Sequence, residues 1–260
     1  MTTEHDLSRW TPVGVAPAYP PLPWRAGWSQ ILSFTIEVSK PDELAALVPA
    51  PLEYSGGTLA SVWCVSFDRH AGTGGYDEVL FSVPATFAGE QGVYPPWLFV
   101  NNDVSVMLGR EVMGVAKKRA DVSVSREEEL YRFTVTRAGS CLVTGSLAPQ
   151  RELPAATVGH MNEALGGPVW GIMDSIGSPG GEAITTERLV VMTRSRRTVL
   201  RAVAGPGAMT FTSSATDHLG LNGEVRVLRA TLLEVDSTLA TSTVKDRWSD
   251  PASLTAAQSE

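Results

Sequence analysis

Segments with the residue preferences of β-strands recur along almost the whole chain, separated by short turn-forming stretches. The segments are rich in Val, Thr, Phe and Leu, and Gly, Pro, Asn and Asp stand between them, which is typical of β-structure. Several segments have apolar residues on both alternating faces, so we expect them to be covered on both sides. The expected strands are 31–38, 58–67, 78–87, 96–108, 120–125, 130–138, 140–149, 186–196, 208–216 and 223–246.

Helical signals are few. Ser39 in an N-cap position, followed by Pro41 and two acidic residues, predicts a short helix in "SKPDELAALV". The stretch "LPAATVGHMNEALGG" predicts a second helix that ends at Gly166, before a glycine-rich loop at 177–182. The expected fold is therefore mainly β with a minor α part, a single domain whose antiparallel sheets form a barrel or a packed pair.

The two ends of the chain differ from this pattern. Residues 1–24 include the proline-rich "APAYPPLPW", which favours an extended lead-in over a helix or strand. Residues 249–260 form a polar tail. No internal repeat, linker or change of composition divides the part between, so we expect one domain over 25–248.

The overall charge argues against several classes of partner. The net charge is -7 and the isoelectric point about 5.2, whereas nucleic-acid and membrane-surface contacts need a clustered basic face. The one basic cluster, "RSRR" at 194–197, is interpreted as a solvated strand face. No apolar run approaches the roughly 18–20 residues of a membrane span, and no secretory signal opens the chain, so a cytoplasmic location is expected.

Motifs for metals, phosphates and serine nucleophiles are missing. The four histidines form no HxxxH or HxH pair, and the two cysteines match no metal or redox spacing, so neither a metal nor another cofactor is expected. The glycine-rich "GTGGYDE" lacks the lysine and the following helix of a phosphate-binding loop. A Ser–His–acid arrangement stays open, although no motif nominates one.

Lys117 and Lys118 are adjacent in a chain that has four lysines and seventeen arginines. An ordinary lysine, with a pKa of about 10.4, is protonated at neutral pH and cannot attack a carbonyl. An apolar surrounding such as "VMGVA", or a second cation, favours the neutral amine. That amine can condense with a ketone to an iminium, which accepts electrons when an adjacent bond breaks. The alternative is a basic surface turn between two strands.

The longer segment "GREVMGVAKKRADV" resembles the signature of the acetoacetate decarboxylase family, roughly G-R-E-x-x-G-x-P-K-K. The matching positions are Gly109, Arg110, Glu111, Gly114, Lys117 and Lys118. The resemblance continues in order over about residues 18–246, through "ELAALVPAPLE", "GGYDEVLFSVPATFAGEQGVYPPWLFVNND", "AVAGPGAMTF" and "GEVRVLRATLLEVD". It implies the barrel-like fold of that family, a lyase activity and a homo-oligomer.

The resemblance also implies roles for individual residues. Lys117 would be the Schiff-base nucleophile, Lys118 its cationic neighbour, and Glu78 a pocket acid/base or substrate-orienting group. A surface carboxylate at a strand edge is the alternative for Glu78. Arg110 and Glu111 would support the lysine turn from a second layer, as a buried ion pair.

Some positions depart from the family pattern. The aromatic residue and the proline that precede the lysines are replaced by Val115 and Ala116. An arginine suited to a carboxylate falls on Ser29 or Gln30, and a second pocket glutamate falls near Val62. These losses suggest that the polar wall of the pocket was rebuilt.

Four residues are weaker candidates for substrate binding. Arg25 is a possible replacement for the family arginine, and Tyr76 and Val115 lie in or near the family motifs. Trp97, like Trp63, would enlarge the pocket or make it more apolar, with core packing as the alternative.

Three functions follow from this reading. The first is decarboxylation of a small β-keto acid through a lysine iminium and an enamine. The second uses the same iminium for aldol condensation and dehydration of a 2-oxo acid such as pyruvate, in secondary metabolism. The third is a non-catalytic ligand-binding homologue. In each case the expected partner is a small keto acid, with no nucleic acid and no membrane.

Overall fold

The computed structural model describes residues 23–71, 73–174 and 187–249. The expected glycine-rich loop at 177–182, the polar tail from 250 onward and nearly all of the proline-rich lead-in lie outside these residues. The helices are α1 (Pro41–Ala46), α2 (Asp103–Glu111) and α3 (Ala155–Ala164). The strands are β1 (Trp24–Val38), β2 (Glu53–Tyr54), β3 (Leu59–Phe67), β4 (Tyr76–Phe87), β5 (Glu90–Val100), β6 (Lys117–Arg119), β7 (Asp121–Glu127), β8 (Leu130–Arg137), β9 (Ser140–Leu147), β10 (Arg151–Glu152), β11 (Val169–Asp174), β12 (Glu187–Gly205), β13 (Gly207–Phe211) and β14 (Val225–Ser249).

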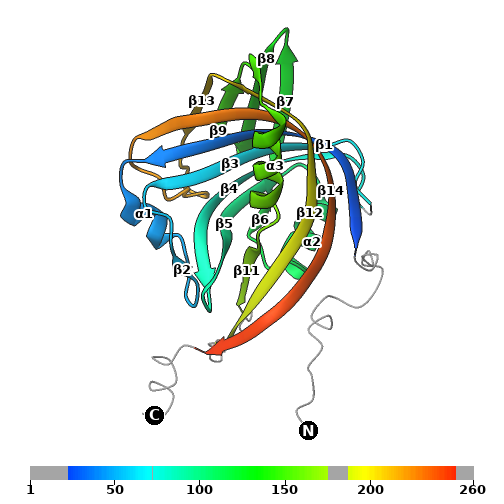
Figure 1. Cartoon of the computed structure of the whole chain (residues 1–260). Coiled ribbons are helices and arrows are strands. Elements are labelled where there is room, and N and C mark those ends of the chain that lie inside the picture. Colours follow the sequence, from blue (N-terminus) through cyan, green and yellow to red (C-terminus); the bar gives the residue numbers. More distant parts are fainter. Residues whose placement is uncertain (1–22, 72, 175–186, 250–260) are drawn as a thin grey trace, which may run out of the picture.

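The larger sheet closes on itself as a barrel. Its order is β2-β4-β3-β1-β14-β12-β11-β5-β6, and pairing of β4 with β5 joins the two ends of a seven-stranded ring. All neighbours are antiparallel except that β5 pairs in parallel with β6 and β11. The long strands β12 and β14 stay paired from Glu187–Ser249 to Gly205–Ala230 and curve together along one side, as Figure 1 shows. The expected mainly antiparallel β fold is confirmed.

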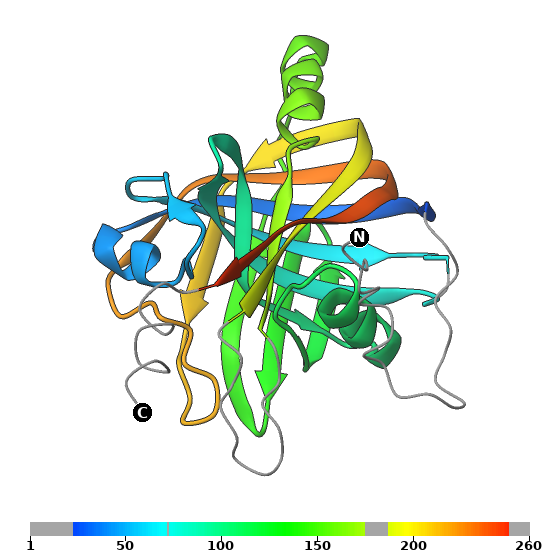
Figure 2. The same ribbon diagram turned by 90° about the horizontal axis from the view of Figure 1, so that it is seen from below.

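A second sheet of four strands, in the order β13-β9-β8-β7, covers part of the outer face of the barrel (Figure 1). The three helices lie apart from one another around the sheets, and Figure 2 shows α3 projecting from one side. α3 lies against β12, where the Asn162 side chain accepts a hydrogen bond of 2.6 Å from the backbone of Val199.

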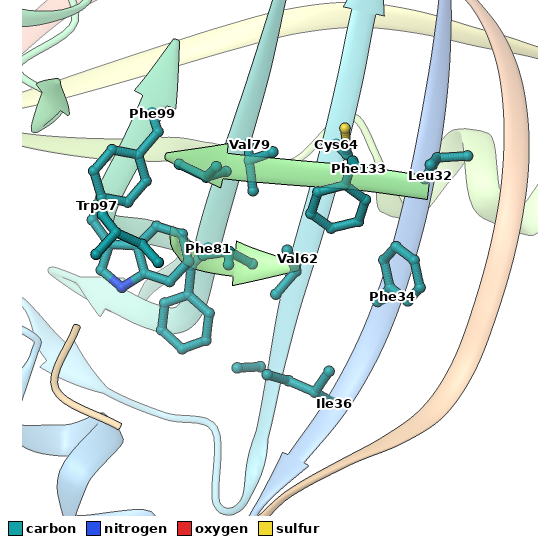
Figure 3. Packing of buried hydrophobic residues seen from close by; sticks show 14 of the residues in the cluster. Leu32, Phe34, Ile36, Val62, Cys64, Val79, Phe81, Trp97, Phe99 and Phe133 are labelled. Carbon is teal, nitrogen blue, oxygen red and sulfur yellow. The ribbon is translucent and has the colours of Figure 1, made fainter. Parts of the chain in front are cut away.

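The main core fills the space between the two sheets. Successive side chains of a strand point to opposite faces. Outward-facing residues of the barrel therefore meet the inner face of the small sheet, and Phe34 packs on Phe133 with ring centroids 5.9 Å apart. Figure 3 shows this layer, formed by Leu32, Phe34, Ile36, Val62, Cys64, Val79, Phe81, Trp97, Phe99 and Phe133. Where the small sheet packs on β1, β3, β4 and β5, the barrel strands are covered on both faces, as their sequences indicate.

Several local expectations are wrong. The expected strand 208–216 is shorter, because β13 ends at Phe211. Residues 96–108 were expected to be one strand, but β5 ends at Val100 and α2 begins at Asp103. The side chain of Asn102 accepts a hydrogen bond of 2.8 Å from the backbone of Ser105, so Asn102 caps a helix and ends the strand. At α1, Ser39 is not the cap, because its hydroxyl instead accepts a hydrogen bond from the backbone of Glu224.

No helix within the described ranges has the length and apolar character that crossing a membrane would require.

Candidate active site

The inward-facing residues of the barrel line a partly open cavity of about 390 Å³. They alternate with the core residues along the same strands, so that one sheet supplies the core on its outer face and the cavity on its inner face. Inward residues of β1, β3 and β4 include Ser29, Ile31, Trp63, Val65, Glu78 and Leu80. The apolar wall is continued by Leu98, Leu108 and Val115.

Lys117 is buried in this cavity, with 4% of its surface exposed. It begins β6, which pairs in parallel with β5 so that Lys117 stands beside Leu98. Its Nζ atom donates hydrogen bonds of 2.9 Å to Oε2 of Glu78 and 3.0 Å to Oγ of Ser105. The structure therefore brings Lys117 and Glu78 together, although 39 residues separate them in the sequence.

The segment before Lys117 is fixed by close packing of the backbone. Gly114 has a φ of 65°, in the left-handed region that favours glycine, and a Cβ atom there would lie 2.9 Å from the Met173 side chain. The carbonyl of Gly114 accepts a hydrogen bond of 2.9 Å from the backbone of Ile172 in β11. On the other side, the aliphatic stem of Lys117 lies against Gly109 of α2. The motif glycines therefore make room for the Lys117 side chain and for the segment that precedes it.

Tyr76 lies on the same wall as Glu78, two residues earlier on β4. Its ring centroid is 5.8 Å from the Lys117 Nζ atom. Burial raises the pKa of Tyr76 well above its usual value, and the negative charge of Glu78 adds to this effect. Tyr76 is thus a neutral phenol beside the Lys117–Glu78 pair.

Lys118 points away from the cavity, because it follows Lys117 on a strand. Its Nζ atom forms an ion pair of 2.7 Å with Oδ1 of Asp217, whose other oxygen is 3.0 Å from Nε of Arg137. Burial would raise the pKa of Asp217, but hydrogen bonds from Lys118 and Thr216 and the charges of Lys118 and Arg137 lower it. The structure does not place Lys118 at the Lys117 amine as an unpaired cationic neighbour.

Arg110 and Glu111 do not form the expected buried ion pair, because both residues are exposed at the end of α2. Helix α2 is amphipathic, and its last turn turns these two side chains outward while Leu108 and Gly109 face inward. Nη1 of Arg110 lies 3.5 Å from the carbonyl oxygen of Lys117, so the contact with the lysine strand is with its backbone.

Two weaker candidates lie outside the cavity. Arg25 is exposed, its nearest carboxylate is Asp236 at 3.9 Å, and it is not among the residues that line the cavity. Trp97 is buried in the core, stacked on Phe81 at 5.0 Å, and donates a hydrogen bond to the carbonyl of Leu219. The expectations that Arg25 replaces the family arginine and that Trp97 lines the pocket are therefore wrong, because strand alternation turns both side chains outward.

Tyr76 and Val115 do line the cavity. The structure also locates the positions where the family pattern has an arginine and a second glutamate. Ser29 is 1% exposed and lines the cavity, but Val62 belongs to the core, and its neighbours Ser61 and Trp63 face the cavity instead.

Sequence reasoning missed Arg197, which lines the cavity from β12. Interpretation of 194–197 as a solvated face holds for Arg194 and Arg196, which are exposed, but Ser195 and Arg197 face inward. The two-residue period of a strand was the available signal, because it separates Arg197 from the other two arginines.

His70 was also missed. It is 8% exposed, lines the cavity and packs edge-on against Phe67 and Tyr76. Its Nδ1 atom is 3.0 Å from the carbonyl oxygen of Ala71. Burial lowers the pKa of His70; the charge of Glu78 raises it and that of Lys117 lowers it. No sequence motif surrounds this histidine. Across the described ranges, no three His, Cys, Asp or Glu side chains cluster in a way that could hold a metal ion.

The amino-acid sequence is similar to those of one family of known proteins. A family model described as "Acetoacetate decarboxylase (ADC)" matches residues 10–248. Acetoacetate decarboxylase 2 of Mesorhizobium japonicum is 29% identical over 153 residues, which are 59% of this chain and 57% of that protein. Acetoacetate decarboxylase of Paraburkholderia phytofirmans is 31% identical over 132 residues, 51% of this chain and 52% of that protein. The chain thus spans about half the length of the curated relatives it matches.

Solved structures share the fold over nearly the whole chain. Acetoacetate decarboxylase from Legionella pneumophila superposes with a TM-score of 0.80 at 22% identity, covering 92% of each chain. An acetoacetate decarboxylase-like enzyme from Sphingomonas wittichii gives 0.72 at 19%, covering 91% of this chain and 97% of that one. The enduracididine biosynthesis enzyme MppR, complexed with pyruvate, gives 0.70 at 17%, covering 90% and 94%.

Proposed function

The chain belongs to the acetoacetate decarboxylase family, and we propose that it is a lyase whose Lys117 forms a Schiff base with a small keto acid. One observation carries this proposal. The Lys117 amine is buried in a cavity of about 390 Å³, within 2.9 Å of the Glu78 carboxylate. A cavity of this size lies at the small end of the range for ligand sites, which suits a substrate of a few heavy atoms.

The contact between Lys117 and Glu78 supports the first step. An ammonium must lose a proton before its nitrogen can attack a carbonyl, and a carboxylate in direct hydrogen-bond contact can accept that proton. The hydroxyl oxygen of Ser105 accepts a second hydrogen bond, of 3.0 Å, from the same nitrogen. Attack on the ketone gives a carbinolamine, which loses water to form the iminium.

Decarboxylation of a β-keto acid is the first candidate reaction. The bond between the α-carbon and the carboxylate breaks, its electron pair moves into the iminium, and carbon dioxide leaves with formation of an enamine. A proton then returns to the α-carbon, and water releases the ketone from Lys117. Glu78, once protonated, is placed beside the nitrogen and can act as the acid in this step.

Aldol condensation followed by dehydration is the second candidate. Here a proton is lost from the carbon next to the iminium, the resulting enamine attacks an aldehyde, and water leaves to give an unsaturated iminium. A second water then hydrolyses this iminium and releases an α,β-unsaturated 2-oxo acid from Lys117. Two observations favour it: the shared fold with MppR, whose solved complex contains pyruvate, and a cavity wall with Ser29, Ser61 and Trp63 where the family pattern has charged groups. This reaction retains the carboxylate.

Reductive trapping tests the Schiff base itself. The protein is incubated with acetoacetate or pyruvate, reduced with borohydride and mapped by mass spectrometry. We expect an adduct on Lys117, absent in Lys117→Ala. An isopropyl group left by acetoacetate indicates that carbon dioxide was lost before reduction, and an unsaturated product from pyruvate and an aldehyde indicates the second reaction.

Lys118→Ala is the matched control, because Lys118 is adjacent in sequence but pairs with Asp217 outside the cavity. The adduct should persist in this variant. Absence of any adduct on Lys117 with either keto acid, in protein shown to be folded by circular dichroism, would leave a non-catalytic ligand-binding homologue as the better description. A cytoplasmic location stays a prediction from the sequence.

A further inference from the structure

Arg197 places a guanidinium on the wall of the cavity that also contains Lys117 and Glu78. One N–H of its Nη1 atom donates a hydrogen bond of 2.8 Å to the carbonyl oxygen of Leu165. Its Cζ atom lies 5.3 Å from the centroid of the Trp63 ring. Among the described residues, no carboxylate forms an ion pair with Arg197.

This cation is only partly satisfied. A guanidinium has five N–H donors, and only one of them meets a protein acceptor in the described residues. Burial lowers the pKa of Arg197, and the negative charge of Glu78 acts in the opposite direction. Arg197 is half-buried, and a partly desolvated cation without a counter-charge is costly, so a charge of this kind on a cavity wall points to an anionic ligand.

The contact with Trp63 uses none of the N–H groups of the guanidinium, and only the donor on Nη1 meets a protein acceptor among the described residues. A pair of the remaining N–H groups can bind the two oxygens of a carboxylate through two parallel hydrogen bonds.

We infer that Arg197 binds the carboxylate of the substrate while the carbonyl carbon of the same molecule reacts with Lys117. The inference rests on the proposed Schiff base and narrows its substrate to keto acids that enter as anions, as opposed to neutral ketones. Trp63 orients the guanidinium. The carboxylate-binding residue of this chain thereby stands on β12, far in sequence from Ser29 and Gln30, where the family resemblance places an arginine.

A purely structural role is the competing explanation. Leu165 directly follows α3, and an arginine that binds a carbonyl at the end of a helix stabilises that end. Loss of this contact would disturb binding of every ligand to a similar extent. The proposed role, in contrast, depends on the charge of the ligand.

Paired ligands separate the two explanations. Acetoacetate and pyruvate are compared with their methyl esters, which keep the ketone and remove the negative charge. For each ligand, the concentration that gives half-maximal borohydride-trapped adduct on Lys117 is measured in the wild-type protein and in Arg197→Met. We expect this concentration to rise by about tenfold or more for the acids and by less than about twofold for the esters, as loss of a charged hydrogen-bond pair predicts.

Two further variants control the experiment. Arg196→Met removes an exposed arginine from the opposite face of the same strand. For all four ligands it should leave the concentration that gives half-maximal trapped adduct unchanged. Arg197→Lys keeps the positive charge but loses the planar pair of donors, and it should recover part of the discrimination between acid and ester.

The results distinguish failure of this inference from failure of the Schiff-base proposal. Equal effects of Arg197→Met on acids and esters would assign Arg197 a structural role, and an unchanged trapping of the acids would also overturn the inference. In both cases the Schiff base stands. If the wild-type protein forms no adduct with any acid or ester, the Schiff-base proposal fails, and the inference fails with it.

Discussion

At the scale of single residues, Glu78 has the contact that the proposed chemistry needs. Replacement by Gln keeps a hydrogen-bond acceptor near the Lys117 amine but removes the charge and the ability to take up a proton. We expect turnover of the keto acid that the wild-type protein converts, acetoacetate or pyruvate with an aldehyde, to fall by about 100-fold or more, the range for loss of a general acid or base. Borohydride should still trap keto acid on Lys117.

The readout is the ratio of turnover to adduct formation, measured on one preparation. If Glu78→Gln loses both to the same extent, Glu78 has an orienting role at Lys117 and no separate role in proton transfer. Glu53→Gln, in the two-residue strand β2 outside the cavity, is the matched control and should change neither quantity.

Asp217 joins Lys118 and Arg137 behind the lysine strand, and we expect it to act on stability. Asp217→Asn leaves both cations without their shared counter-charge. We expect the free energy of unfolding at pH 7 to fall by about 2–3 kcal/mol, the order of a charged hydrogen-bond pair. Urea denaturation measures this change.

The pH dependence of this effect has a definite sign. The pKa of Asp217 is lower in the folded protein than in the unfolded chain. Its contribution is therefore fully present above the ordinary aspartate pKa of about 3.9, and it is lost as the pH falls through the lower folded value. The stability difference between the wild-type protein and Asp217→Asn should shrink below about pH 4. A difference that stays constant down to pH 2 would contradict the ion-pair explanation.

At the scale of secondary-structure elements, the packing of α2 against β6 decides where the Lys117 amine lies. A Cβ atom on Gly109 would approach within 2.3 Å of the Lys117 Cδ atom. Gly109→Ala should therefore displace the Lys117 stem and lower the yield of trapped adduct several-fold, even though alanine favours a helix by about 1 kcal/mol.

Gly159→Ala is a closely matched control. It makes the same substitution in another helix, α3, where a Cβ atom would meet nothing within 4 Å. We expect it to raise the stability slightly, by about 0.5–1 kcal/mol, and to leave trapping unchanged. Equal trapping in both variants would show that the lysine stem adapts without cost.

At the scale of the whole molecule, the two faces of the barrel sheet separate stability from function. Phe133 is 1% exposed and lies in the core between the sheets, away from the cavity. Phe133→Ala should lower the free energy of unfolding by about 3–5 kcal/mol, as for other buried aromatic residues. In buffer without denaturant, the folded fraction should still form the Lys117 adduct at the wild-type level. A loss of trapping in protein that is folded would mean that the core and the cavity are coupled.

Association into a homo-oligomer stays a prediction at this scale. It follows from the family resemblance, and large apolar side chains such as Leu200 and Leu228 are exposed on the single chain. Light scattering coupled to size exclusion should give a multiple of the chain mass of 27.8 kDa. A mass equal to one chain would overturn the prediction.

The sequence by itself determined the strand content and the lysine motif. Valine- and threonine-rich runs with alternating faces indicate strands whatever their partners, and the resemblance around "GREVMGVAKK" and Glu78 identifies the family. The wrong expectation of one strand over 96–108 also has a local explanation. Asn102 could be recognised as a helix cap only once the strand before it was known to end at Val100.

The tertiary structure alone decided which side chains share the cavity. Lys117 and Lys118 are neighbours in sequence, but a strand sends them to opposite faces, one to Glu78 and the other to Asp217. Arg197 reaches the cavity because closure of the barrel brings β12 opposite β4, and Arg25 is excluded because its strand turns it outward. The direction of a side chain depends on strand register and on which face becomes the interior, and both are set by pairings between residues distant in the sequence.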